Sequence, residues 1–415
     1  MMMKYKFLLL FLIGVSGFSQ TKAIYNQSVE AYQNKDYALF LKLTQQLDSI
    51  RPSHPTFTYN LASAFALNGK STEAFSVLRQ IILSNNTVAF EDDADFESLR
   101  NLEGFQLLNE LKVSQNKTIK QSKFKVSLSE KDLHPESALY VSNKKLWLAS
   151  SIRNKKIVSF DVSSGKCSDW FVDVKYSVFA MKADAKEEFL WVSTSAIPEM
   201  KGFSKEMEGK NEILKIDIAT KKVVQRFSVE GNHVFGDLIV GKNNEVYVSD
   251  SAEPLVYKIA EDKISVWKDF RNEAFNLQGI TFNENQTKLF IADYLKGIVM
   301  IDLKSNSHSW LKFPENATKK GIDGLVFYKN SLIAIHNGVT PIRIVQYQLN
   351  QENNEIVDFV VLDHNRNEFN EPALASVFEN RLYFFANSPW KLYDKNFVLD
   401  ASKLEAPNLF ELSLK

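Results

Sequence analysis

The sequence is poor in cysteine and carries no excess of charge. Cys167 is the only cysteine, so no disulfide can form within the chain. Lys and Arg together number 50, Asp and Glu together also number 50, and no block of basic residues occurs. This balance argues against nucleic acid and anionic membrane surfaces as partners.

The chain also lacks the short motifs of several enzyme classes. It has no Gly-x-Ser-x-Gly elbow, no phosphate-cradling loop and no dinucleotide fingerprint. Its six histidines show neither His-x-His nor His-Glu-x-x-His spacing, which removes the usual zinc signal. No set of residues supports an oxidoreductase that uses a quinone.

The N-terminus has the pattern of a secretory signal. Lys4 and Lys6 precede an apolar stretch from Phe7 to Val15, and small residues follow up to Ser19. The stretch is too short for a stable membrane anchor. We predict a signal peptide over residues 1–19, a periplasmic or secreted protein, and no integral membrane segment after signal removal.

Residues 21–117 have the apolar periodicity of helices. Two copies of one pattern align at an offset of 34 residues, with Tyr25 over Tyr59 and Asn34 over Asn68. This offset is the length of a tetratricopeptide unit, which the second copy resembles closely. We predict a short tetratricopeptide-like array of α-hairpins that serves either as a structural base or as a docking site for a protein partner.

The rest of the chain repeats a pattern of short apolar runs six times, at intervals of 42 to 57 residues. The repeats begin at Ala138, Ala180, Asp237, Gly279, Gly324 and Ala373. Such runs, rich in β-branched and aromatic residues and separated by turn residues, predict strands. Four strands for each repeat predict a six-bladed β-propeller over residues 123–415.

The ends of this region predict how the propeller closes. The last repeat stops after its third strand, whereas the alternating segment Phe124–Leu128 precedes the first repeat without a partner. We expect this N-terminal strand to complete the sixth blade. The fold class is therefore a multidomain α plus all-β chain, a helical array followed by a closed propeller.

Two blade entries carry a family resemblance. The runs Leu277–Asp293 and Ile322–Phe327 resemble the regucalcin (senescence marker protein), gluconolactonase and luciferin-regenerating enzyme family, and the resemblance covers residues 123–415. That family is a six-bladed propeller whose central pocket holds one divalent cation, calcium or zinc. Its cation polarises a lactone or ester carbonyl, and an Asp acts as general base.

Carried over by position, the resemblance implies a partial metal site. The family's Glu falls on Glu136, one Asn falls on Gln278, and the Asp that is both ligand and general base falls on Asp323. The second Asn falls on Gly236, so that ligand is missing, although Asp237 keeps a carboxylate nearby. The implied metal set is thus Glu136, Gln278 and Asp323, with Asp323 catalytic.

The same columns of the repeat give further candidates for the substrate pocket. These are Asp237, His336, Glu371 and Asn387. His336 is either a neutral hydrogen-bonding residue or a metal ligand, and the first role is commoner for a lone histidine. Asp250 and Asp293, which end second strands, are interpreted as caps of the following turns.

Two functions stay open from the sequence. In the first, the exported propeller binds a small ligand at its centre and hydrolyses a lactone or ester with a divalent cation. In the second, helices and propeller form a non-catalytic scaffold for partners or ligands, with a decayed metal site. The departures at Gly236 and Gln278 favour the second, and the retained Glu136 and Asp323 favour the first.

Overall fold

The structure is a computed structural model that describes residues 9–415. The chain divides into two compact units, one that covers the chain up to Asn116 together with Asn316–Thr318, and one that holds the remainder from Lys117. The predicted basic region with Lys4 and Lys6 lies outside the described residues. Within residues 9–415, no helix combines the length and the apolar character needed to cross a membrane.

The first unit is helical. Its elements are α1 (Leu9–Gln33), α2 (Tyr37–Ile50), α3 (Pro55–Leu67), α4 (Ser71–Ser84), the 3-10 helix η1 (Ala94–Leu99) and α5 (Glu103–Ser114). Asp36 caps α2 by accepting a hydrogen bond from the Leu39 N–H over 3.0 Å. Buried side chains such as Leu47 and Leu78 form the contacts between successive helices. The tetratricopeptide-like identity of these helices stays a prediction.

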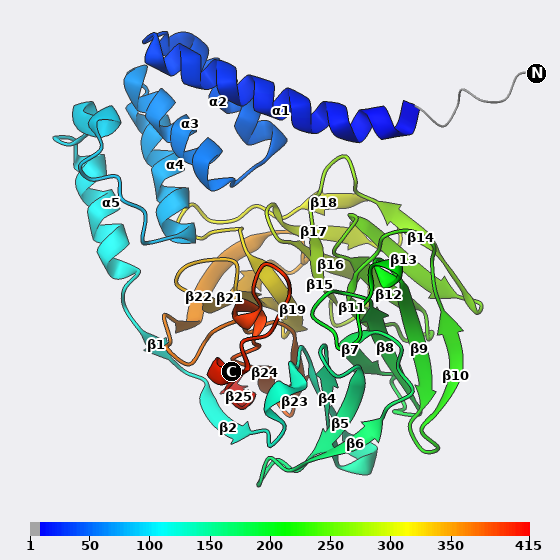
Figure 1. Ribbon diagram of the computed structural model, residues 1–415. Helices are drawn as coiled ribbons and strands as arrows, with labels where there is room; N and C mark the ends of the chain where they lie inside the picture. The colour runs from blue at the N-terminus through cyan, green and yellow to red at the C-terminus, as the bar shows by residue number, and fades with distance from the viewer. Residues whose placement is uncertain (1–8) are drawn as a thin grey trace, which may run out of the picture. The chain divides into compact units, whose positions relative to one another are not determined.

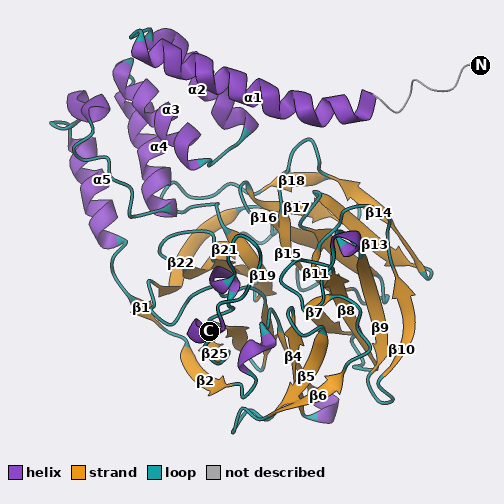
Figure 2. Cartoon of the chain, viewed as in Figure 1, coloured by secondary structure: helices purple, strands orange, loops and turns teal. Residues whose placement is uncertain are grey.

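The second unit is a six-bladed β-propeller, whose sheets surround a common axis (Figure 1) and are joined by short loops (Figure 2). The first three blades contain β3 (Ala138–Val141), β4 (Leu146–Ser151), β5 (Lys156–Phe160), β6 (Cys167–Phe171), β7 (Ser177–Ala183), β8 (Phe189–Ser195), β9 (Asn211–Asp217), β10 (Lys222–Phe227), β11 (Phe235–Val240), β12 (Val246–Asp250), β13 (Leu255–Ala260) and β14 (Lys263–Asp269). The last three contain β15 (Leu277–Phe282), β16 (Lys288–Asp293), β17 (Gly297–Asp302), β18 (His308–Trp310), β19 (Ile322–Tyr328), β20 (Ser331–His336), β21 (Arg343–Leu349), β22 (Ile356–His364), β23 (Ala375–Phe378), β24 (Arg381–Phe385) and β25 (Asn408–Ser413).

Two strands from before the first blade join the last two sheets. β1 (Ile119–Lys120) pairs with β22 and makes the fifth blade five-stranded. β2 (Lys123–Ser127) pairs antiparallel with β25 and is the fourth strand of the sixth blade. The two ends of the propeller chain therefore meet in one sheet, where β2 is the outer strand and covers the edge that β25 would otherwise expose.

The blades form because local turn chemistry agrees with the strand pattern. Lys329 and Asn330, both with positive φ, connect β19 to β20, and Glu379 and Asn380 connect β23 to β24 in the same way. Two-residue turns of this conformation match the right-handed twist of a hairpin. The apolar faces of neighbouring sheets then pack against each other to form the core between blades.

The innermost strands form the ring that positions the site. Contacts run from β3 to β7, β11, β15, β19 and β23, and from β23 back to β3. Gly279 and Gly324 allow β15, β19 and the segment before β23 to approach closely. A Cβ on Gly279 would lie 2.6 Å from the Asp323 carbonyl oxygen, and one on Gly324 would lie 2.2 Å from that of Ala373.

Candidate functional site

Four acidic side chains from different blades interact at the propeller axis. Glu136 precedes β3, Asp237 lies on β11, Asp323 lies on β19 and Glu371 precedes β23. Repulsion from Asp323 and Glu371 acts on Glu136, and repulsion from Glu371 and Asp237 acts on Asp323. The ring of innermost strands thus brings together four of the residues that the sequence singled out.

Asp323 lies in an environment that shifts its pKa toward neutral pH. Burial raises its pKa to about 7, and repulsion from Glu371 and Asp237 adds to the effect. The Asn337 amide donates a hydrogen bond to Asp323 Oδ2 over 2.5 Å, and the Tyr294 hydroxyl donates to Asn337 Oδ1 over 3.0 Å. A carboxyl with a pKa near 7 can both take up and release a proton at neutral pH.

Glu136 is only 6% exposed and has a neutral partner. The Trp390 indole N–H donates a hydrogen bond to Glu136 Oε1 over 2.6 Å. Burial, followed by repulsion from Asp323, raises the pKa of Glu136 well above its ordinary value. Among the described residues, neither Glu136 nor Asp323 forms an ion pair, so no cation offsets the rise in the pKa of Glu136 that burial causes.

Asp237 links two blades and is less available to a ligand. Its Oδ1 accepts a hydrogen bond from the Leu238 N–H over 2.8 Å, and its Oδ2 accepts one from the Ile280 N–H over 3.1 Å. Lys182 Nζ lies 3.9 Å from Oδ1. This carboxyl therefore joins β11 to β15, and its charge is partly balanced.

Glu371 and Asn387 pair through an isolated parallel bridge, but they have different roles. Glu371 Oε2 forms an ion pair with Lys391 Nζ at 3.0 Å. The Asn387 amide donates to the Ala406 carbonyl oxygen over 3.0 Å and accepts from the Asn408 N–H over 2.8 Å. Both ends of the Asn387 side chain are thus used to hold the loop after β24, and its role in a substrate pocket stays a prediction.

The three residues implied as metal ligands do not form an oxygen cage. The Gln278 amide donates to Asn276 Oδ1, and its Oε1 lies 3.4 Å from the donor Ser251 Oγ. One oxygen each of Glu136 and Asp323 is also committed to a protein donor. Within residues 9–415, no group of three or more His, Cys, Asp or Glu side chains is placed to hold a metal ion. The donor set therefore does not fit calcium or zinc in this arrangement.

His336 lies inside the fifth blade as a neutral hydrogen-bonding residue. Its Nδ1 lies 2.8 Å from the Lys320 carbonyl oxygen, and its Nε2 lies 3.0 Å from the Tyr347 hydroxyl. Burial lowers the pKa of His336 to about 3. Both ring nitrogens are thus used, and neither is left for a metal ion.

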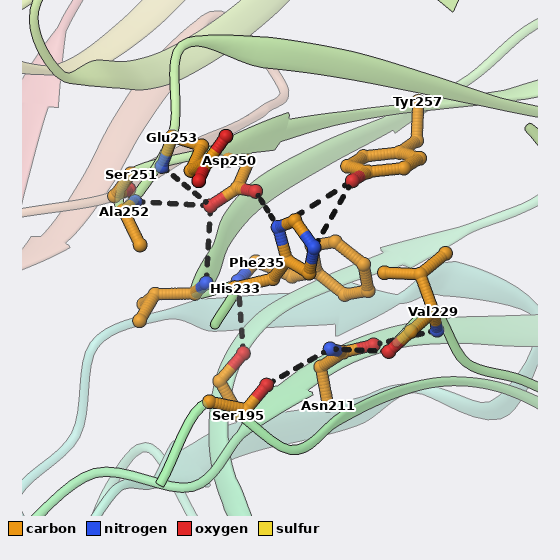
Figure 3. A network of polar contacts seen from close by, with 12 residues as sticks. Ser195, Asn211, Val229, His233, Phe235, Asp250, Ser251, Ala252, Glu253 and Tyr257 are labelled. Carbon is orange, nitrogen blue, oxygen red and sulfur yellow. Dashed lines mark hydrogen bonds and ion pairs between the residues drawn. The ribbon is translucent and has the colours of Figure 1, made fainter. Parts of the chain in front are cut away.

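A second buried network fixes the entry to the third blade (Figure 3). His233 Nδ1 lies 2.6 Å from Asp250 Oδ2, and His233 Nε2 lies 3.1 Å from the Glu230 carbonyl oxygen. Asp250 Oδ1 also accepts the backbone N–H groups of Val234, Ala252 and Glu253 at 3.0, 2.9 and 3.2 Å.

This network positions the strand that carries Asp237. The Phe235 N–H donates to Ser195 Oγ over 2.8 Å, so the start of β11 is tied to the second blade as well (Figure 3). Asp293 acts similarly in the fourth blade, where Oδ1 accepts from the Leu295 and Lys296 N–H groups. Asp250 and Asp293 therefore cap turns, as the repeat pattern indicates.

The structure adds residues that sequence reasoning missed. Tyr294 and Asn337 each follow the last residue of a second strand by one position, and both contact the axis through Asp323. A search one residue beyond each second strand would have found them. Trp390 lies on the loop after β24, and its contact with Glu136 is not indicated by any position of the repeat.

Fold and site together define a six-bladed β-propeller with coupled carboxyl groups at its axis. No protein-family model and no curated protein matches the sequence. Among solved structures, the chain is similar to PQQ-bound aldose sugar dehydrogenase from Streptomyces coelicolor, with 11% identity, a TM-score of 0.49, and coverage of 72% of this chain and 98% of that one.

Two further solved structures show a comparable likeness. Catalytically inactive virginiamycin B lyase from Staphylococcus aureus with quinupristin has 14% identity and a TM-score of 0.47, over 71% of this chain and 100% of that one. Luciferin-regenerating enzyme has 12% identity and a TM-score of 0.45, over 70% of this chain and 92% of that one.

Proposed function

We propose that the propeller binds a small polar ligand at its axis and hydrolyses a lactone or ester there, with Asp323 as general base and Glu136 as general acid. One observation carries this proposal. Two carboxyl groups without cationic partners, the buried Glu136 and the half-buried Asp323, interact by repulsion at the axis, and the pKa of Asp323 is raised to about 7. Clustered, perturbed carboxyl groups of this kind are typical of acid–base sites.

The chemistry needs only a water molecule as co-reactant. Asp323, ionised, takes a proton from water while the water oxygen bonds to the carbonyl carbon of the ligand. The bond from that carbon to the leaving oxygen then breaks, and the protonated Glu136 gives its proton to the leaving oxygen. The product of a lactone is a hydroxy acid. The proton on Asp323 returns through solvent to Glu136, which restores both groups.

A divalent cation, calcium or zinc, has no part in these steps because the implied ligands are already engaged by Trp390, Asn337, Asn276 and Ser251. Removal of divalent cations therefore distinguishes this reaction from the metal-dependent one. We expect turnover to survive treatment with EDTA and to stay unchanged when calcium or zinc is added back. Loss on chelation with recovery on add-back would instead favour the metal-dependent reaction.

The test is a panel of lactones and esters, assayed with the purified chain from residue 20 onward. We expect Asp323→Asn to lose at least about a hundredfold in kcat, the range of a general base. Asp161→Asn is the matched control, because Asp161 is an exposed turn carboxylate bonded to Ser163 and Ser164. The hydrolase proposal fails if the wild type turns over none of the panel, or if Asp323→Asn is as active as the control.

The second candidate is a non-catalytic scaffold in which helices and propeller hold partners or ligands. The observation that favours this function is that the Trp390 indole N–H already donates a hydrogen bond to Glu136. In that case a bound small molecule would stay unchanged. Calorimetric binding without turnover, abolished by Asp323→Asn, would distinguish this function from hydrolysis.

Export to the periplasm or medium is part of the same proposal. It rests on the basic residues and apolar stretch before Ser19. Fractionation of cells that express the full chain should place the protein outside the cytoplasm, shortened at the N-terminus. A full-length product that stays in the cytoplasm would rule export out.

A further inference from the structure

The loop between β24 and β25 places one short segment against the axial site. We call Ser388–Tyr393 the cap segment. Ser388 Oγ donates to the Pro135 carbonyl oxygen over 2.5 Å, directly beside Glu136, and Trp390 donates to Glu136 itself over 2.6 Å. Lys391 pairs with Glu371, and the Tyr393 hydroxyl lies 3.1 Å from His134 Nδ1.

The indole of Trp390 lies in an apolar setting next to this carboxyl group. It packs against a cluster formed by Ile152, Phe179 and Ile197, together with Val234. The site therefore holds a flat ring on an apolar wall and directs the N–H of that ring to the Glu136 oxygen. A ligand that uses Glu136 must take over this position.

The base of the loop is fixed, and the part beyond the base has contacts of its own. Asn387 bonds to both Ala406 and Asn408, which pins the two ends of the loop together. Beyond this point the Asp400 N–H donates to the Leu392 carbonyl oxygen over 2.8 Å, and a bridge joins Tyr393 to Leu399. Compact surface loops whose ends lie close together and that are packed by their own side chains are frequently functional.

We propose that the cap segment is a displaceable lid, and that Trp390 occupies the place of the ligand on Glu136. The lid opens when the incoming ligand offers a flat ring with an N–H or O–H donor at its edge, the group that Trp390 supplies in the closed state. This inference rests on the proposed function for its choice of site and deepens it by naming the ligand class. Its test does not depend on turnover.

The probe is indole, with 1-methylindole as a control that has the same shape but no N–H donor. Hydrogen exchange of the Leu392 and Tyr393 amides, which bond to the Pro389 and Trp390 carbonyl oxygens, reports lid opening. In the wild type we expect indole to speed this exchange several-fold and 1-methylindole to leave it unchanged. Exchange of the β24 amides should not respond to either.

Trp390→Phe tests the contact without removing the ring. We expect the cap amides to exchange about fivefold faster, as for the loss of one ordinary hydrogen bond. Trp310→Phe is the matched control, because the Trp310 indole N–H also faces a glutamate, Glu273 Oε2 at 3.4 Å, on the outer strand of the fourth blade. That variant should leave the cap amides at the wild-type rate.

Each outcome decides part of the inference. If the cap amides exchange only as slowly as β24 in the wild type and in Trp390→Phe, the segment is fixed and the lid is wrong. The affinities of the Trp390→Ala variant for the two probes are also compared. If this variant binds indole no more tightly than it binds 1-methylindole, the proposed ligand class is wrong. Failure of the lactone and ester panel, with these exchange results intact, would reject the hydrolase and leave the lid in place.

Discussion

The Trp390 indole N–H donates a 2.6 Å hydrogen bond to the carboxyl group of Glu136, a residue 254 positions earlier in the chain. The bond joins the loop of the sixth blade to the entry of the first. The bond favours the ionised carboxylate, so it opposes the rise in the pKa of Glu136 that burial and repulsion from Asp323 cause, without cancelling that rise. In the proposed mechanism, Glu136 in its protonated form is the proton donor.

Asp323 should make the protein less stable as the pH rises. Its pKa is about 7 in the folded chain against 3.8 for an ordinary Asp, so the folded state holds the proton more tightly. The free energy of unfolding should therefore fall between about pH 4 and pH 7, by at most about 4 kcal/mol. Asp323→Asn does not titrate, and its urea denaturation curves should lack this fall. An identical slope in both proteins would contradict the assignment.

Gly279→Ala should disturb the axis. The new Cβ would lie 2.5 Å from the Leu325 nitrogen and 2.6 Å from the Asp323 carbonyl oxygen, both backbone atoms that cannot turn aside. We expect a loss of roughly 1–3 kcal/mol in the free energy of unfolding. Gly241→Ala is the control, since its nearest neighbour would lie 3.4 Å away. Equal thermal stability of the two variants would show that the inner strands are not closely packed here.

Asp250→Asn should weaken the entry to the third blade. The substitution keeps the shape of the side chain but removes the charge that faces His233 at 2.6 Å. Weakening the hydrogen bonds that this buried carboxyl group accepts should cost roughly 1–3 kcal/mol. Asp161→Asn, on an exposed turn, should shift the denaturation curve much less. Chemical denaturation measures both, and a small effect at Asp250 would show that the pair contributes little.

His336 should make the protein sensitive to acid. Burial holds its pKa at about 3 in the folded chain, against 6.5 for an ordinary histidine. The unfolded state therefore takes up a proton first, and the contribution of His336 to stability is complete above pH 6.5 and is lost as the pH falls toward 3. His336→Gln should reduce the steepness of this loss, by up to about 1.4 kcal/mol for each pH unit. Denaturant titrations at pH 7, 5 and 4 give the slope, which stays the same if another group controls it.

From the sequence, residues of the candidate site could be predicted only at positions that the repeat itself defines. Glu136, Asp237, Asp323 and Glu371 lie at equivalent blade entries, so a closed ring of blades must direct them toward one axis. The metal-ligand role implied for Gln278 stays a prediction, and the structure shows its amide bonded to Asn276 and Ser251. Such local pairing depends on side-chain conformations that a repeat pattern does not specify.

The amino-acid sequence by itself determined the helical region, the six repeats of short strands and the column of residues at the axis, because strand periodicity and turn chemistry act over a few neighbouring residues. Only the tertiary structure decided which of the axial groups are free to act. The pKa of Asp323, the donor on Glu136 and the position of the loop around Trp390 depend on burial and on contacts between distant blades. Those contacts exist only once the ring is closed, since closure removes water from the axis and places like charges close together.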